Sequence, residues 1–245
     1  MGSGIWRSPR ALAVAALLTA LAASAAGAAS PSGDSTIART GVLVAADFPA
    51  GFTPSTASGS SHADNVKLAK GVDGCAPYVA LQKALIPLPQ AKSPKFDDAS
   101  RSISNEVDVF PTDKAASAAL VLYAKSSMVG CLESLFEKQI RQGANAQQSI
   151  DDVMVDLNRQ DIADLGDESV VYEGSVALTG TDGAQSKLGI GAAAVRVGRA
   201  VDVVSYSTDG TSLTDVLTPA IDASVARLRT ALARPATATA TATAT

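Results

Sequence analysis

Between residues 150 and 208 the sequence consists almost entirely of segments in which apolar residues alternate with polar or small ones. The alternation is clear at 153–157 and 170–178, and it returns in KLGIGAAAVRV and AVDVVSYST. A period of two is typical of strands, and the short connections TGTDGAQ and Gly198-Arg199 favour hairpins. The sequence therefore predicts an antiparallel meander of four strands.

A fifth strand and several helices are expected around this meander. Apolar residues alternate with Ser, Glu and Asp over residues 103–109, which indicates a strand with one face in solvent. Thr112 can cap a following helix, apolar spacings of three and four from Met128 to Ile140 indicate another, and Thr218-Pro219 can open the last. We expect one α+β domain over residues 40–233, an antiparallel sheet of about five strands with helices packed on one face.

The two ends of the chain differ from this domain. Residues 1–28 have two arginines, the apolar run 11–23 and an Ala-Gly-Ala cleavage site, the pattern of a secretory signal peptide. No cysteine follows the run, so we expect no membrane anchor after cleavage. Residues 29–39 are small and polar and are expected to be a flexible leader, and the Ala/Thr repeat 234–245 a disordered tail. We therefore expect a secreted protein, in the medium or at the cell wall.

Charge limits the classes of partner. Cleavage would remove two of the 20 basic side chains and none of the 24 acidic ones, so the mature chain is more negative than the −4 of the full sequence. An acidic surface disfavours binding to nucleic acid.

The chain has two cysteines, Cys75 and Cys131, and both lie on apolar stripes of expected helices. In an exported protein an even count favours a disulfide, and two buried thiols are the alternative. A catalytic thiol needs a nearby base, and the only histidine, His62, stands in a Ser-rich stretch. Two distant cysteines and one histidine match no zinc motif, so we expect no metal site.

The remaining motifs are weak. SGSSHAD brings Ser61, His62 and Asp64 together, but triad members converge from separate elements, and a polar loop is the simpler interpretation. GIGAAA fits a dinucleotide fingerprint only in letters, because a strand continues through it, and we expect no cofactor. The acidic pairs 151–152 and 167–168 are expected to be solvated, since strand neighbours point to opposite faces.

Several stretches together resemble a known group of proteins. VLVAADFPAGFT, VDVFPTDKAASAAL, VGCLESLF, LGDESVVYEG and AAVRVGRAVDVVSYST, behind a signal peptide, resemble exported actinobacterial proteins of unknown function. More distantly, the chain is similar to the extracellular sensor domains of mycobacterial serine/threonine kinases. The resemblance implies a disulfide-linked antiparallel sheet backed by helices, and a role in sensing or binding outside the cell.

We therefore expect a secreted, non-enzymatic, sensor-like module that binds a small molecule or envelope component between sheet and helices. Tyr172, Arg196 and Tyr206 are candidate ligand-binding residues, chosen for their chemistry alone. The alternative is a structural or protein-interaction component of the cell envelope. A hydrolase based on Ser61 and His62 is a third hypothesis.

Overall fold

The computed structural model describes residues 32–56, 61–143, 150–162, 165–209 and 214–233. The expected signal peptide, residues 1–28, and the Ala/Thr tail lie outside the described residues. So does the beginning of the expected leader.

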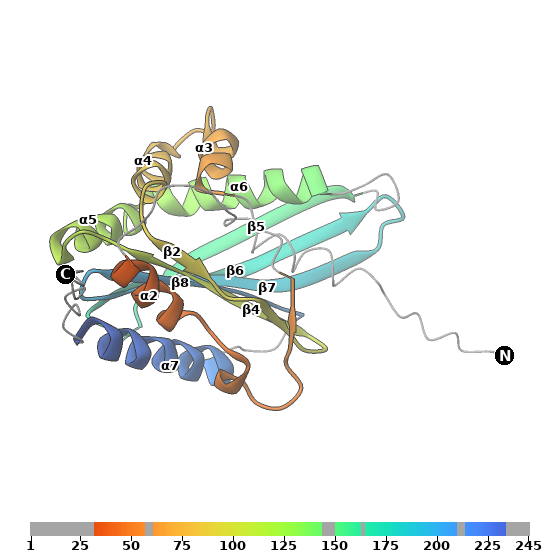
Figure 1. The fold of residues 1–245 in the computed structure, drawn as a ribbon. Coiled ribbons are helices and arrows are strands. Elements are labelled where there is room, and N and C mark those ends of the chain that lie inside the picture. The colour runs from red at the N-terminus through yellow and green to blue at the C-terminus, as the bar shows by residue number, and fades with distance from the viewer. Residues whose placement is uncertain (1–31, 57–60, 144–149, 163–164, 210–213, 234–245) are drawn as a thin grey trace, which may run out of the picture.

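An antiparallel sheet forms the centre of the fold (Figure 1). Four consecutive strands, β5 (Ile150–Gln160), β6 (Glu168–Gly180), β7 (Gln185–Val197) and β8 (Ala200–Thr208), pair in sequence order as the predicted meander. Strand β4 (Arg101–Val109) pairs with β8. Short strands β1 (Thr53–Ser55) and β3 (Lys95–Asp97) continue the sheet, and β2 (Gln90–Lys92) also pairs with β4.

The sheet has eight strands, so the prediction of about five was too low. The three that were missed, β1, β2 and β3, have three residues each. Such a segment is too short to show a period of two. Strands β2 and β3 form here because β4 offers a partner on the side away from β8, and β1 pairs in turn with β3.

Helices cover both faces of the sheet, which corrects the expectation of one covered face (Figure 1). One face carries α3 (His62–Ala69), α4 (Ala76–Leu85), α5 (Asp113–Tyr123) and α6 (Ser127–Gly143). The other carries α2 (Ser32–Gly41) and α7 (Thr214–Ala233). A short 3-10 turn, η2 (Ala45–Asp47), follows α2. Two hydrophobic cores result, one on each side of the sheet.

Helix α2 corrects the expectation of a flexible leader, because residues 32–39 belong to it. Polar residues dominate its sequence, but Ala38 is completely buried against α7 and the sheet. Tertiary packing of one narrow stripe thus outweighs a loop-like composition. Ser224 Oγ of α7 further ties the end of α2 by donating to the Gly41 carbonyl at 2.7 Å.

Other local predictions fare differently. Thr112 caps α5 as expected, and its Oγ1 accepts a hydrogen bond from the Ala115 amide. Helix α7 begins at Thr214 rather than at Thr218, so Pro219 lies inside it. A proline in the first turns of a helix still leaves the later backbone hydrogen bonds intact.

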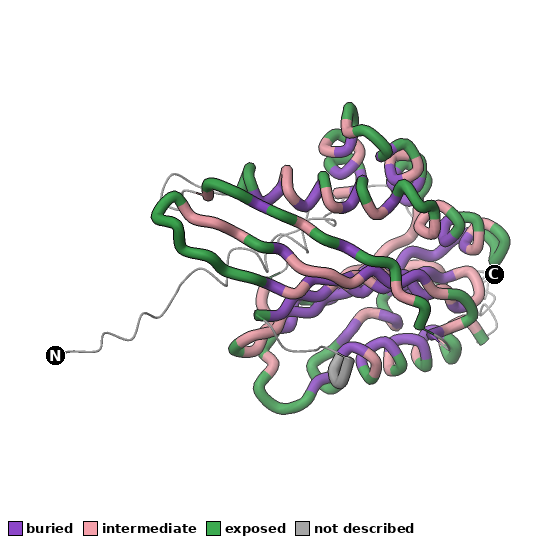
Figure 2. The backbone as a smooth tube through the Cα atoms, turned by 180° about the vertical axis from the view of Figure 1, so that it is seen from behind, coloured by how far each residue is buried: buried purple, intermediate pink, exposed green. Residues whose placement is uncertain are grey.

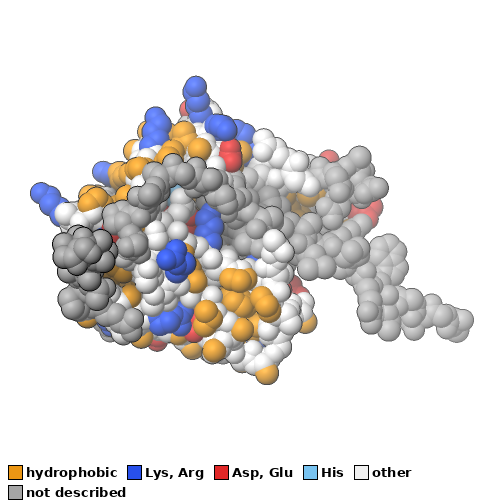
Figure 3. All heavy atoms as spheres, viewed as in Figure 1, with side chains coloured by type: hydrophobic (Ala, Val, Ile, Leu, Met, Phe, Trp, Pro, Cys, Tyr) orange, Lys and Arg blue, Asp and Glu red, His pale blue; other side chains and the backbone are white. Residues whose placement is uncertain are grey.

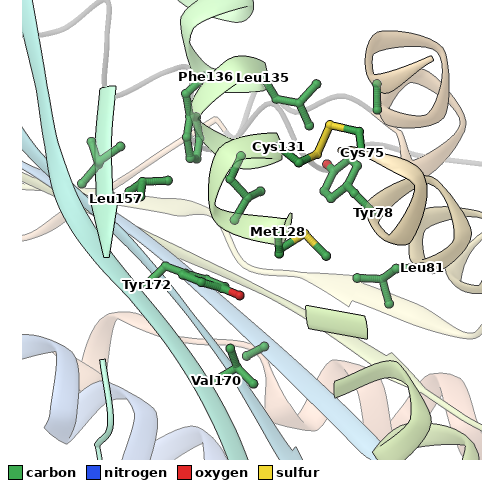
Figure 4. Packing of buried hydrophobic residues seen from close by; sticks show 14 of the residues in the cluster. Cys75, Tyr78, Leu81, Met128, Cys131, Leu135, Phe136, Leu157, Val170 and Tyr172 are labelled. Carbon is green, nitrogen blue, oxygen red and sulfur yellow. A yellow bond between two sulfur atoms is a disulfide. The ribbon is translucent and has the colours of Figure 1, made fainter. Parts of the chain in front are cut away.

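Cys75 and Cys131 form the predicted disulfide, with their Cα atoms 4.9 Å apart. Figure 4 shows it between α4 and α6, among the packed side chains of the first core. Cys75 directly precedes α4, and Cys131 lies in the first half of α6. The bond therefore joins two helices of the same layer.

Burial follows this layered arrangement (Figure 2). Buried residues run along the middle of the sheet and the inner sides of the helices, whereas the β6–β7 hairpin end is exposed. Within the described ranges no single helix has the length and hydropathy of a membrane span; α5 and α6 pass that test only as a pair bent by 72°. On the face seen in Figure 3, basic and hydrophobic side chains are interspersed.

Candidate functional site

A cavity of about 50 Å³ lies between the sheet and the layer of α3 to α6. It has room for roughly three to five water molecules, since each needs about 10 to 15 Å³. Most of its wall is apolar, and the side chains include Leu85, Leu132, Phe136, Leu157, Val170, Ala194 and Val203. One end is polar and consists of His62, Tyr78, Gln82, Glu106 and Asp108.

Strand β4 supplies the two carboxylates of the polar end. Glu106 and Asp108 are two residues apart and so lie on the same face, while Val107 and Val109 point into the other core. Helices α3 and α4 cover the polar face of this strand, and the side chain of Asp108 is only 1 % exposed, that of Glu106 11 %. The strand predicted to face solvent on one side is therefore buried on both.

His62 is the first residue of α3 and corrects the expectation of a polar loop at SGSSHAD. Ser61 is the N-cap, and its Oγ accepts from the Asp64 amide at 3.1 Å and bonds to Asp64 Oδ2 at 2.7 Å. The His62 ring is instead buried and contacts Gln82 and the β4 carboxylates. Ser61, His62 and Asp64 are thus not arranged as a catalytic triad, because the hydroxyl and the ring have different partners.

The hydrogen bonds of His62 fix its tautomer. Its Nδ1 lies 2.8 Å from Gln82 Oε1, and Asn65 Nδ2 donates to the same oxygen at 3.1 Å. An oxygen that accepts from Asn65 is a carbonyl, so Nδ1 carries a proton and donates to it. The other ring nitrogen, Nε2, faces Glu106 Oε1 at 3.4 Å and Asp108 Oδ1 at 3.5 Å.

Burial and mutual charge dominate the electrostatics of this cluster. Burial, and then the charge of Asp108, raises the pKa of Glu106. Burial alone would lower the pKa of His62, but Asp108 and Glu106 outweigh it and raise the pKa. Lys92 Nζ lies 3.4 Å from Glu106 Oε1, and burial lowers the pKa of this ammonium despite that neighbour. Negative charge is therefore concentrated around the His62 Nε2 position.

Five polar atoms at this end make no hydrogen bond within the described part of the chain, and they come from four residues: His62 Nε2, Tyr78 OH, Glu106 Oε1, and Asp108 Oδ1 and Oδ2. A buried polar atom without a partner costs about 1 to 3 kcal/mol, and a charged one costs more. Concentration of such atoms at one end of a cavity is typical of a site where a ligand supplies the partners.

The three residues expected to bind ligand do not share one site. Tyr172 lines the cavity, and its hydroxyl donates to the carbonyl of Tyr123. Tyr206 belongs to the core on the opposite side of the sheet and donates to Glu173 Oε1 at 2.6 Å. Arg196 donates to Glu168 Oε1 at 3.0 Å and to the Gly198 carbonyl at 2.9 Å, and it is not among the residues that line the cavity.

The polar residues of the site were missed for identifiable reasons. Glu106 and Asp108 alternate with valines, a pattern that predicts a strand with one face in solvent. That face is buried only because α3 and α4 pack over it. His62 is isolated in sequence, 44 residues before Glu106 by the numbering. One available signal was that a sole histidine beside an N-cap serine can open a helix and turn inward.

Comparisons with known proteins add little to this geometry. No protein-family model matches the chain, and no curated protein matches its sequence. Among solved structures, the extracellular domain of PknH from Mycobacterium tuberculosis aligns with 65 % of this chain and 76 % of its own, at 8 % identity and a TM-score of 0.37. The Saccharomyces cerevisiae Ran-binding protein Mog1p aligns with 53 % of this chain and 62 % of its own, at 14 % identity and a TM-score of 0.21. At these scores neither similarity assigns a ligand or a function.

Proposed function

We propose that this protein is an exported, non-enzymatic binding module that takes a small molecule into the cavity between its sheet and α3 to α6. The molecule has a short apolar body and one cationic or hydrogen-bond-donating group. The observation that carries the proposal is the polar end itself, where buried carboxylate oxygens of Glu106 and Asp108 make no hydrogen bond within the described residues, and the one ammonium nearby, that of Lys92, lies 3.4 Å from Glu106 Oε1. An ammonium group would supply donors to acceptors of this kind.

The apolar wall supports the second part of the ligand's description. Side chains such as Leu132, Phe136 and Leu157 offer no hydrogen bonds, so they favour a hydrocarbon portion over a sugar or a phosphate. The volume limits the portion that enters to about three to five heavy atoms, given room for roughly three to five waters. A larger ligand would have to extend out of the cavity.

The disulfide supports both rigidity and export. It joins α4, which carries Gln82 and Leu85, to α6, which carries Leu132 and Phe136, so it holds two walls of the cavity in register. A site that is already ordered loses less entropy on binding. Disulfides also persist mainly in oxidising compartments outside the cytosol.

Thermal unfolding with three probes of equal length tests the proposal. n-Butylamine, n-butanol and butyrate each have a chain of four carbon atoms and differ in the polar group. The protein is first treated with EDTA and dialysed, and ionic strength is matched with sodium chloride. We expect n-butylamine to raise the Tm most, n-butanol less and butyrate not at all, because only a ligand bound to the native state stabilises it.

Variants locate the response. Asp108→Asn and Glu106→Gln should reduce the n-butylamine effect, and Asp152→Asn, an exposed carboxylate on β5, should leave it unchanged. The proposal fails if none of the probes changes the Tm, which would favour the envelope-interaction role. It also fails if n-butylamine acts equally on Asp108→Asn and on the unaltered protein.

A further inference from the structure

The strongest further feature is the convergence of three potential metal ligands from two elements. His62 Nε2 comes from α3, and Glu106 Oε1 and Asp108 Oδ1 come from β4. All three atoms lie within 4.8 Å of one another. Each is buried and makes no hydrogen bond to another described residue.

The separations fit an ion better than a direct ion pair. A hydrogen bond between an imidazolium and a carboxylate is about 2.7 to 2.9 Å long. Nε2 is instead nearly equidistant from both oxygens, at 3.4 and 3.5 Å. Two ligands of a tetrahedral zinc ion, each about 2.0 to 2.1 Å from the metal, lie about 3.3 Å apart. The two distances from Nε2 are thus close to the edge of such a tetrahedron, and the two carboxylate oxygens lie within 4.8 Å of each other.

The tautomer of His62 points in the same direction. Because Nδ1 donates to Gln82, Nε2 is the ring nitrogen that faces the two carboxylates, as an N–H in the imidazolium and as a lone pair in the neutral ring. A lone pair facing negative charge is unfavourable unless a positive species lies between them. Metal-binding histidines commonly donate their other ring N–H to an oxygen in this way, which orients the ring and increases its basicity.

We propose that His62 Nε2, Glu106 Oε1 and Asp108 Oδ1 form a binding site for one divalent transition-metal ion of the zinc type. One nitrogen and two carboxylate oxygens suit zinc and its neighbours better than calcium or magnesium, which prefer oxygen alone. Three protein ligands leave a fourth position open, and all three residues line the cavity. The inference rests on the proposed function only in placing binding at the polar end.

Lys92 is the cation that competes with the metal. Its Nζ lies 3.4 Å from Glu106 Oε1, and its side chain is 20 % exposed, so it can turn outward when an ion binds. Replacing Lys92 removes a positive charge next to the site and leaves all three proposed ligand residues unchanged. Lys92→Met should therefore bind zinc several times more tightly than the unaltered protein.

Zinc titration of the EDTA-treated protein, with any histidine tag removed, tests the proposal. Since His62 is the only histidine, the imidazole nitrogen NMR signals report on one ring and need no assignment. We expect one zinc per chain by calorimetry and by metal analysis after dialysis. We also expect the Nε2 signal to shift while Nδ1 stays protonated.

Variants of the proposed ligand residues are compared with a control variant at an exposed carboxylate. Glu106→Gln and Asp108→Asn should each weaken zinc binding at least tenfold, with Asp152→Asn as the control. The proposal is overturned if the folded protein retains no zinc at micromolar free zinc, if Nε2 does not respond, or if Asp108→Asn binds as well as the unaltered chain. Should the variants not fold, the Nε2 response and Lys92→Met decide. The n-butylamine assay uses metal-free protein and the titration uses no amine, so either proposal can fail alone.

Discussion

Replacing Asp202 by Asn should make the protein's stability far less sensitive to pH. Asp202 lies on β8 in the core beneath α7 and is completely buried. Its Oδ1 accepts from Asn105 Nδ2 at 2.8 Å, and its Oδ2 lies 2.6 Å from Ser224 Oγ. The Ser224 hydroxyl has a single proton, and its Oγ also lies 2.7 Å from the Gly41 carbonyl oxygen, to which it donates that proton. The hydrogen bond between Ser224 Oγ and Asp202 Oδ2 therefore needs a proton from Asp202. The geometry fits a protonated Asp202.

The pKa of Asp202 determines the sign and the size of the change in stability with pH. Burial raises the pKa of Asp202 from 3.8 to about 7, although Ser224 and Asn105 oppose the rise. Between these values the folded state holds a proton that the unfolded chain has lost, so stability is full at low pH and falls as pH rises. The loss reaches about 1.4 kcal/mol per pH unit, and about 3 kcal/mol between pH 5 and pH 8.

Urea unfolding of both proteins at pH 5, 6, 7 and 8 measures this directly. Asn in place of Asp202 reproduces the bonds of the protonated acid and does not titrate, so its stability relative to the unaltered protein should increase by about 3 kcal/mol from pH 5 to pH 8. Glu106 contributes to the pH dependence of both proteins and cancels in the difference. A difference that is constant across this range, or that favours Asp202 at pH 8, would refute the reasoning.

Two further predictions concern the frame around the site. Replacing both Cys75 and Cys131 by Ser should lower the free energy of unfolding by about 4 kcal/mol, because the disulfide closes a loop with a sequence separation of 56 residues. Urea unfolding measures this difference. An unchanged unfolding midpoint would mean that the crosslink does not restrict the unfolded chain. Gly174→Ala should lower the free energy of unfolding by about 3 kcal/mol, since its Cβ would lie 1.8 Å from the Asp156 carbonyl oxygen of the paired strand. Gly130→Ala, in α6 with nothing within 4 Å of the added Cβ, should raise the free energy of unfolding by up to about 1 kcal/mol. Calorimetry of the two variants measures the contrast, and equal effects would contradict it.

The central sheet was predictable because its strands are long and apolar residues recur along them with a period of two. Over 150–208 the period of two is repeated four times, and Gly198 with a φ of 53° supplies the turn that a hairpin between β7 and β8 needs. The second helical layer was less visible. Its signal lay in β7, where Ala193 and Val195 on one face and Ile190 and Ala194 on the other are all buried. Apolar residues on both faces of a strand indicate cover on both sides.

The polar end of the cavity could not be predicted in the same way. A strand with valines on one face and Glu106 and Asp108 on the other has the same sequence pattern whether its polar face meets water or a helix. What decides is the position of α3 and α4, which depends on contacts between residues far apart in the chain. His62 reaches the carboxylates only after α3 packs on α4 through Asn65 and Gln82.

The disulfide and the polar end are linked through this layer of helices. Closing α3 and α4 over Glu106 and Asp108 removes water from two carboxylates, which opposes the closure. The Cys75–Cys131 bond anchors the start of α4 to α6, just before Tyr78 and Gln82 enter the cavity, and so favours the closed arrangement. A cation bound between the carboxylates would remove part of the same cost. Zinc should therefore stabilise the Cys75→Ser/Cys131→Ser double variant more than it stabilises the unaltered protein, if the layer opens without the crosslink. Equal gains in Tm would mean that the layer stays closed on its own packing.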